Sequence, residues 1–335
     1  MVWSSGKSGN FAHCKSFSSR YFRPEFLVRI GVAATPSVAI PTMQWLKDSE
    51  NIFEVIITRP DQQAGRGRNL KSSPVAQWGE EHGISVIKPA SPNDMVETIS
   101  TLDLVITIGY GVLLPLEVLK IPRYGFINLH FSLLPKWRGA APVNRAIQNG
   151  DSISGVSVFQ LDAGMDTGPI YVQKEIAISD EECAGDVLRN MALLGPSAIE
   201  ETLNLIAMGF APIAQSVSGI SFAPKISKSE VEIDWNQSAE KVQRNIRAFT
   251  PEPGAWTSWR DAPIIIAKSA LIADISDLKP GSIRLIDGNV VIGCGEESAI
   301  RLDEVRPSGK NTMTAQAWAR GARLHEGNCF VSSNG

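Results

Sequence analysis

Closely spaced cysteines and histidines are absent from this sequence. Its 335 residues include only four of each, and no two cysteines form a Cys-x-x-Cys pair. Disulfide frameworks and structural zinc sites require such spacing. The pattern therefore argues against both, predicts no metal cofactor and favours a reducing compartment. The cysteines are Cys14, Cys183, Cys294 and Cys329, and the histidines are His13, His82, His130 and His325.

A long apolar run and an excess of charge of one sign are also missing. No apolar stretch reaches the roughly 20 residues that span a bilayer, so no membrane-spanning helix is predicted. The formal net charge is only −3 at pH 7, which by itself does not indicate nucleic-acid binding. A chain of 335 residues is long enough for two domains. We expect a cytoplasmic monomer that needs no protein partner.

Residues 1–27 differ in composition from the rest of the chain. They are rich in serine, and four basic residues precede Glu25, the first acidic residue. This composition is compatible with an organellar transit peptide. Because the segment lacks a clear amphipathic helix, we favour a disordered extension instead.

Residues 28–211 alternate between apolar strand patterns and helical patterns. Strands separated by helical segments are typical of a doubly wound, mostly parallel α/β sheet, so a Rossmann-like domain is predicted here. The polar run 59–68 contains two glycines, fits neither regular element and is expected to be an exposed loop. The main predicted strands are 28–34, 53–58, 84–88, 103–108, 125–129 and 155–161.

A second domain is predicted after a linker. Residues 212–228 show no helical period and hold two prolines, as is typical of a connecting segment. Residues 229–332 then contain a helix at 238–248 and short strand patterns, two of them separated by Asp287-Gly288, a strong hairpin signal. A small β-barrel of the OB type is the natural closed arrangement of such strands.

Three polar residues follow or end predicted strands of the first domain. Asn128 and His130 alternate on one strand, so both side chains point to the same face. Asp166 lies on a turn between Gly164 and Gly168. Open α/β sheets place their sites at the carboxyl ends of strands, so the three are expected to converge there.

An amide, an imidazole and a carboxylate are the groups that an acyl transfer needs. The amide can donate to a developing oxyanion, and an imidazole titrates near neutral pH and can act as a general acid. Taken singly, a histidine at a strand end is more often an ordinary hydrogen-bonded side chain, and an aspartate between glycines is more often a turn residue. Their combination favours the catalytic interpretation.

The spacing of these residues resembles that of the formyltransferases that use 10-formyltetrahydrofolate. The similarity comprises Asn128-x-His130, the loop Ser132-Leu-Leu-Pro135 and Asp166, 38 residues after Asn128. Pro135-x-Trp-Arg-Gly-Ala-Ala-Pro142 is similar to the branch that formylates initiator Met-tRNA rather than glycinamide ribonucleotide. The resemblance spans 28–321 and includes Phe222-Ala-Pro-Lys-Ile-Ser-Lys228 in the linker.

The resemblance implies roles for particular residues. Asn128 would stabilise the oxyanion, His130 would be the acid, and Asp166 would orient His130 and receive the proton of the attacking amine. The residues implied in folate binding are Gly109, Tyr110, Gly111, Ser132, Leu133, Leu134 and Pro135. The residues implied in tRNA binding are Arg66, Arg68, Lys71, Lys136, Arg138, Arg244 and Arg247.

The basic residues of the second domain are balanced by acids. From residue 226 onward there are 13 Lys and Arg against 14 Asp and Glu, so tRNA binding cannot be argued from net charge and depends on arrangement. We expect salt-dependent tRNA binding that weakens on charge reversal at Arg244 and Arg247.

Other functions fit the sequence less well. A formyltransferase acting on a small amine, such as a nucleotide or an amino sugar, is the nearest alternative. An inactive RNA-binding module would have lost the catalytic residues, and a nicotinamide-dependent oxidoreductase would need a glycine fingerprint that the first βα turn lacks. That turn has Ala34 where the resembled family commonly has glycine. If this position requires a positive φ, Ala34 would be strained there.

Overall fold

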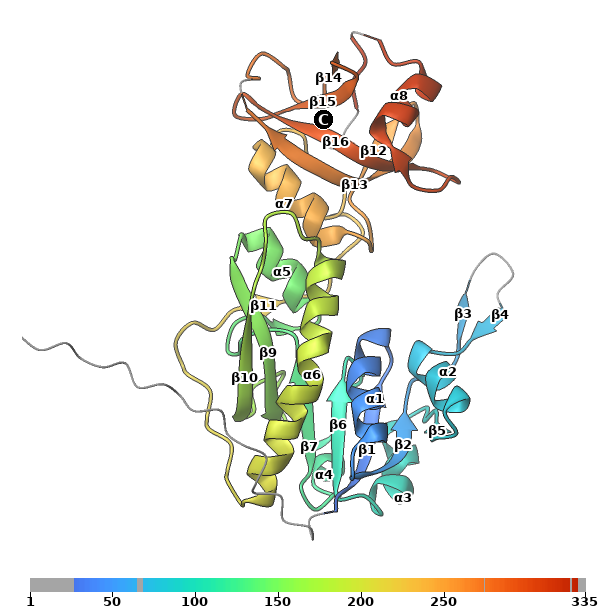
Figure 1. Cartoon of the computed structure of the whole chain (residues 1–335), viewed down its shortest axis with the longest axis vertical. Coiled ribbons are helices and arrows are strands. Elements are labelled where there is room, and N and C mark those ends of the chain that lie inside the picture. The colour runs from blue at the N-terminus through green and yellow to red at the C-terminus, as the bar shows by residue number, and fades with distance from the viewer. Residues whose placement is uncertain (1–26, 65–68, 274, 326, 331–335) are drawn as a thin grey trace, which may run out of the picture.

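The computed structural model describes residues 27–64, 69–273, 275–325 and 327–330. An α/β domain carries a smaller domain built on an antiparallel sheet, with helix α7 between them (Figure 1). The extension predicted over residues 1–27 lies, except for its last residue, outside the described residues.

The α/β domain is organised around a seven-stranded sheet with the order β10-β9-β7-β6-β1-β2-β5. The five strands from β7 to β5 pair in parallel, while β7–β9 and β9–β10 are antiparallel. This confirms the predicted mostly parallel sheet. The strands are β1 (Arg29–Ala34), β2 (Ile52–Ile57), β5 (Ser85–Ile87), β6 (Leu104–Ile108), β7 (Phe126–His130), β9 (Ile153–Gln160) and β10 (Ile170–Ala177).

Helices cover both faces of this sheet because its central strands are apolar on both sides. All five residues of β6 are buried. The long helix α6 (Ala184–Ala207) packs on α1 (Ile40–Asp48) and on β9 and β10. A second buried cluster, which includes Met95, Val118 and Phe126, fills the opposite face. The other helices are α2 (Pro74–Glu81), α3 (Val96–Ile99), α4 (Leu116–Leu119) and α5 (Pro142–Asn149), with single 3-10 turns at Ser37–Ala39 and Pro92–Met95.

One local expectation for this domain was wrong, and the strain considered for Ala34 does not arise. The run 59–68 was expected to be irregular, but β3 (Gln62–Ala64) and β4 (Asn69–Lys71) pair as an antiparallel hairpin. Its strands show no apolar alternation, which is why the pattern was not visible in the sequence. Ala34 ends β1 as an ordinary strand residue, fully buried, so no strain arises from the missing glycine.

The second domain is an antiparallel sheet that curls into a half-barrel against α7 (Ala239–Phe249) (Figure 1). The predicted fold class is confirmed, and Asp287 and Gly288 form the turn between β14 and β15, both at positive φ. The strand β12 and the helix α8 were not predicted. The elements are β12 (Trp256–Trp259), β13 (Ala262–Ile272), β14 (Ile283–Ile286), β15 (Asn289–Cys294), β16 (Ser298–Pro307), β17 (Met313–Thr314) and α8 (Ala315–Ala322).

The two domains are docked through α5 and α7. Asn144 donates from Nδ2 to the Ala248 carbonyl at 2.6 Å, and Arg145 pairs with Glu230 at 3.0 Å and also donates to the Pro224 carbonyl. These are directional contacts between partly buried groups, so they fix the orientation of the second domain.

The connecting segment 212–228 is not a free loop. Its strand β11 (Phe222–Ala223) pairs in parallel with β8 (Arg138–Gly139), and Ile213 forms an isolated bridge with Ile170. The segment therefore runs along the α/β domain beside the residues that follow β7.

Candidate functional site

Asn128 lies near the carboxyl end of β7, opposite Thr107 on β6. The Thr107 hydroxyl donates to Asn128 Oδ1 at 2.7 Å. With Oδ1 bonded to Thr107, the Nδ2 group lies on the other branch of the amide. The hydrogens of Nδ2 are thereby available as donors to a group beyond the strand end.

His130 ends β7 and is almost completely buried. Its Nε2 lies 2.9 Å from the Trp137 carbonyl oxygen, and the edge of the ring meets Phe159. Because a carbonyl only accepts, Nε2 carries the hydrogen, and Nδ1 is the atom that can gain or lose a proton. This Nδ1 faces Asp166 Oδ2 at 3.8 Å, which is longer than a hydrogen bond.

Asp166 stands on a tight turn after β9. Its φ of 53° is in the left-handed region, and its Oδ2 accepts the Gly139 backbone N–H at 2.7 Å. The flanking glycines are needed for close approach, since a Cβ on Gly168 would lie 1.8 Å from the Gln160 carbonyl oxygen. His130 and Asp166 thus face each other at 3.8 Å, and Asn128 precedes His130 on the same strand. Because β9 runs antiparallel to β7, the turn that carries Asp166 follows a strand of the opposite direction rather than a neighbouring parallel strand.

The loop after His130 is fixed by hydrogen bonds of the Ser132 and Ser157 hydroxyls. The Ser132 hydroxyl donates to the Lys136 carbonyl at 2.6 Å, and the Ser157 hydroxyl donates to the Ser132 carbonyl at 2.6 Å and accepts the Leu134 N–H at 3.0 Å. Ser132 and Leu134 are buried, whereas Leu133 and Pro135 remain partly exposed. Ser132 and Leu134 therefore fix the shape of the loop, and the surface it offers comes from Leu133 and Pro135.

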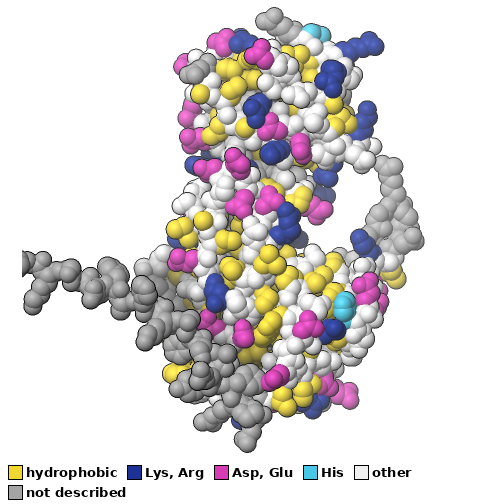
Figure 2. Space-filling model, viewed as in Figure 1, with side chains coloured by type: hydrophobic (Ala, Val, Ile, Leu, Met, Phe, Trp, Pro, Cys, Tyr) yellow, Lys and Arg dark blue, Asp and Glu magenta, His cyan; other side chains and the backbone are white. Residues whose placement is uncertain are grey.

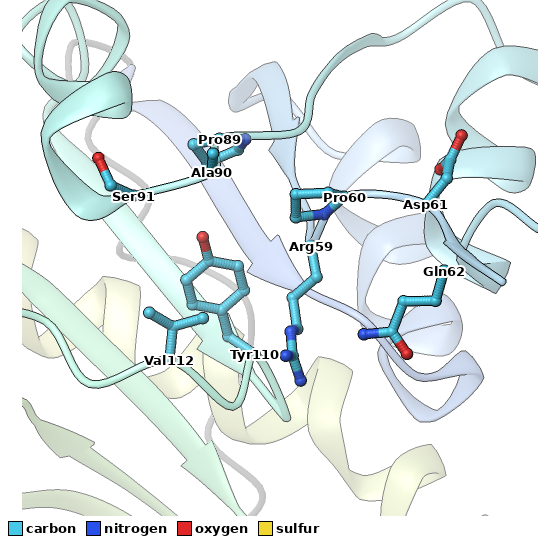
Figure 3. Close-up of a pocket in the computed structure, with 9 residues that line it drawn as sticks. All are labelled: Arg59, Pro60, Asp61, Gln62, Pro89, Ala90, Ser91, Tyr110 and Val112. Carbon is cyan, nitrogen blue, oxygen red and sulfur yellow. The ribbon is translucent and has the colours of Figure 1, made fainter. Parts of the chain in front are cut away.

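A cavity of about 300 Å³ opens where β2, β5 and β6 end. Figure 3 shows Arg59 and Tyr110 extending into it next to one another, with Ser91 and Val112 on the wall. Burial raises the pKa of the Tyr110 phenol, and the positive charge of Arg59 opposes that increase. Asp61, also on the wall, pairs with Lys88 at 2.7 Å, and this contact lowers its pKa. The cavity thus combines an aromatic ring with a cation.

The basic residues singled out in the sequence are not equivalent in the structure. Arg66 and Arg68 lie outside the described residues. Lys71 and Lys136 are exposed, and the Arg244 side chain is 40% exposed at 3.7 Å from Glu240. Basic and acidic side chains are mixed over the visible face of the second domain (Figure 2).

Two arginines are engaged inside the protein. Arg247 is 7% exposed, lies 3.5 Å from Asp180 at the junction of the domains, and has its pKa lowered by burial. The Arg138 guanidinium donates to the side-chain oxygen of Gln215. Neither guanidinium offers much free surface to a phosphate.

Several residues of the site were missed in the sequence. Thr107 and Ser157 are isolated hydroxyls within apolar strands. Because a buried hydroxyl needs a hydrogen-bond partner, their position in these strands was the sequence signal that could have identified them. Gln215 and Ser221 lie in a polar linker, where no local pattern distinguishes them.

Two further findings concern the described residues only. They contain no group of three or more His, Cys, Asp or Glu side chains placed to hold a metal ion. None of their helices is both long and apolar enough to cross a membrane.

Comparisons with known proteins point to one family. The family model "Formyl transferase" matches residues 30–203, and "Formyl transferase, C-terminal domain" matches 225–323. The methionyl-tRNA formyltransferase of Salinispora arenicola is 41% identical over 305 residues, which cover 90% of this chain and 99% of that protein.

Solved structures share the fold at lower identity. The methionyl-tRNA formyltransferase of Clostridium thermocellum superposes with a TM-score of 0.54 at 17% identity, over 73% of this chain and 94% of that chain. HypX of Aquifex aeolicus in complex with tetrahydrofolic acid gives a TM-score of 0.61 at 17% identity over 87% of this chain. The present chain spans about half the length of HypX, 47%.

Proposed function

The chain belongs to the methionyl-tRNA formyltransferase family, and we propose that its formyl donor is 10-formyltetrahydrofolate and its acceptor the α-amino group of methionine on initiator Met-tRNA. The observation that carries this proposal is the grouping of Asn128, His130 and Asp166, with His130 Nδ1 3.8 Å from Asp166 Oδ2. The reaction takes place without a metal ion in this proposal.

The amine nitrogen attacks the formyl carbon, and the bond from that carbon to N10 of the folate breaks. A tetrahedral intermediate with a negatively charged oxygen lies between these steps. Asn128 Nδ2, on the branch of the amide not bonded to Thr107, donates to that oxygen, and a donor already fixed by the protein needs no reorganisation at the moment of reaction.

Two proton movements accompany the transfer. The attacking amine loses a proton, which Asp166 receives directly or through a water molecule. The departing N10 gains one, which His130 supplies from Nδ1 once its ring is protonated, Nε2 being held by the Trp137 carbonyl. The Asp166 carboxylate lies 3.8 Å from this Nδ1, so the two residues act as a pair.

The folate lies against the loop after β7 in this proposal. Leu133 and Pro135 supply apolar surface, while Ser132 and Leu134 fix the loop beneath them. The backbone of Gly109, Tyr110 and Gly111, at the end of β6, offers its polar groups to the pterin. The tetrahydrofolic acid in the HypX structure supports a folate donor in this fold.

Tyr110 and Arg59 line the 300 Å³ cavity, and we assign this cavity to the aminoacyl end of the tRNA. An arginine matches a phosphate through charged hydrogen bonds, and an aromatic ring provides a surface on which a base can stack. Arg59 also leads into the β3–β4 hairpin, which contains Lys71 and which the sequence assigned to tRNA.

Replacing Arg59 with glutamine is expected to raise KM for Met-tRNA about 10-fold and leave KM for the folate unchanged, since the cation contacts only the acceptor. Steady-state kinetics with each substrate varied in turn measures both constants. Lys120→Gln removes an exposed cation beyond α4, away from the cavity, and serves as the control. A rise in the folate KM alone would move the cavity to the donor.

Charge reversal of Arg244 to glutamate is expected to weaken Met-tRNA binding several-fold at low salt and to reduce the salt dependence by about one phosphate contact. Titration of tRNA at several salt concentrations measures the slope, with Lys120→Glu as the control. Arg247 is left intact because its reversal would bury a carboxylate next to Asp180 and unfold the junction. An unchanged slope would remove Arg244 from the tRNA surface.

The activity itself is tested by incubating the protein with 10-formyltetrahydrofolate and either Met-tRNA or free amines, followed by analysis for N-formylmethionine. We expect product on Met-tRNA only. Formylation of a nucleotide or an amino sugar, without reaction of Met-tRNA, would instead support the alternative of a small-amine formyltransferase. The expected cytoplasmic location and monomeric state stay predictions.

A further inference from the structure

One side chain of the connecting segment is turned inward although its neighbours are exposed. Gln215 is partly buried, whereas Ile213 is 77% and Val217 is 94% exposed. In an ordinary surface segment the apolar side chains would be covered and the amide would face water. The reversal indicates that the segment is held in place by what Gln215 contacts.

Every hydrogen-bonding position of the Gln215 side-chain amide is occupied next to Asp166. Its Nε2 donates to the carbonyl oxygens of Asp166 and Gly168, both at 2.8 Å. Its Oε1 accepts from Arg138 Nη2 at 2.6 Å and Nε at 3.1 Å. An amide has two hydrogens to donate and two lone pairs to accept with, so all four positions are occupied.

Asp166 has a specific need for such support. Its φ of 53° lies in the left-handed region, which residues other than glycine adopt uncommonly. Asp166 is fixed in two places: Gln215 holds its backbone carbonyl, and the Gly139 N–H holds Oδ2, one oxygen of its carboxylate.

The same segment also supports the partner of His130. The Ser221 hydroxyl accepts the Trp137 N–H at 2.9 Å, and the Ser221 carbonyl accepts the Arg138 N–H at 2.9 Å. The Trp137 carbonyl is the group bonded to His130 Nε2. The connecting segment thus supports both Asp166 and the carbonyl partner of His130. Gln215 lies 49 residues after Asp166 in the sequence.

We propose that Gln215 is a positioning residue for formyl transfer: it clamps the Asp166 turn to Arg138 and so holds the carboxylate facing His130. The proposal depends on the role proposed for Asp166. It assigns Arg138 to the same clamp, as the cation that fixes the amide oxygen of Gln215, rather than to the tRNA surface.

Gln215→Met keeps the length of the side chain and removes its four hydrogen bonds. We expect kcat to fall about 10-fold or more with KM for both substrates changed less than 2-fold, because binding surfaces stay and only the carboxylate is misplaced. In an Asp166→Asn background the same change is expected to cost less than a further 2-fold, since the group that Gln215 positions no longer acts.

Ser216→Ala is the matched control, because Ser216 is the exposed neighbour and its side chain bonds only within the linker, to Ser218. Gln215→Glu is the second variant, in case the methionine enzyme does not fold. It keeps the acceptors for Arg138 and loses both donors, so the same loss of kcat is expected. Circular dichroism and thermal unfolding verify the fold of each variant.

The outcomes separate this proposal from the one it depends on. Wild-type kcat in folded Gln215→Met, or an equal loss in the wild-type and Asp166→Asn backgrounds, would overturn the positioning role alone. A fully active Asp166→Asn enzyme would overturn the role of Asp166 as well. A raised KM with unchanged kcat would make Gln215 a binding residue and also contradict the proposal.

Discussion

His130→Ala is expected to lower kcat for formyl transfer by about 10³-fold, within the range that removal of a general acid or base produces. The imidazole is the group whose Nδ1 faces Asp166, and no neighbouring side chain can replace it as a proton donor at neutral pH. Single-turnover assays with saturating donor and Met-tRNA measure the chemical step. Equilibrium titration should give dissociation constants for both substrates within about 3-fold of wild type.

The control for this variant is His82→Ala. His82 is half-buried and stacks on Trp78 with ring centroids 4.3 Å apart, at the end of α2. Its loss removes a comparable aromatic contact away from the site, so kcat should stay within 2-fold. Near-normal turnover of His130→Ala would mean that the proton comes from elsewhere, and the proposed mechanism would have to be abandoned.

Asp166→Asn is expected to lower kcat by about 10²–10³-fold with little effect on KM. Asparagine keeps the shape of the turn and can still accept the Gly139 N–H, but it cannot take up the proton of the attacking amine. The measurement is the rate of formyl-Met-tRNA formation under saturating substrates.

Asp162→Asn provides the matched control on the same turn. Asp162 Oδ1 accepts from the Gly164 N–H at 3.0 Å and from the Thr167 hydroxyl at 2.7 Å, and an amide oxygen can accept both. Its activity should stay within a few-fold of wild type. If the two variants lost activity equally, the effect would be one of turn structure, and a proton-accepting role for Asp166 would be contradicted.

The burial of Arg247 shows that a pattern of basic residues in the sequence does not by itself identify a tRNA-binding surface. In the sequence Arg244 and Arg247 lie one turn apart on a helix and look alike. In the structure Arg244 keeps 40% of its side chain exposed, with its guanidinium over Gly150 and 3.7 Å from Glu240, whereas Arg247 is buried and lies 3.5 Å from Asp180. Helical spacing gives which residues share a face, but not what covers that face, so only the docking of α7 on α5 and α6 distinguishes the two.

The fold was predictable where the signal is local. The apolar strands of the first domain, the helix predicted at 238–248 and found at Ala239–Phe249, and the Asp287-Gly288 turn follow from periodicity and turn chemistry within a few residues. The β3–β4 hairpin was not predictable because its strands are polar and show no apolar alternation. The β8–β11 pair was not predictable because its two-residue strands come from distant parts of the chain.

The residues proposed to be catalytic divide in the same way. Alternation along β7 determined that Asn128 and His130 share a face, and the glycines around Asp166 determined a tight turn. The tertiary structure decided how they are held: Thr107 orients the amide, the Trp137 carbonyl fixes the imidazole, and Gln215 secures the carboxylate. These bonds join residues 7 to 49 positions apart, and a separation of that size is set by the path of the chain, which no local pattern records.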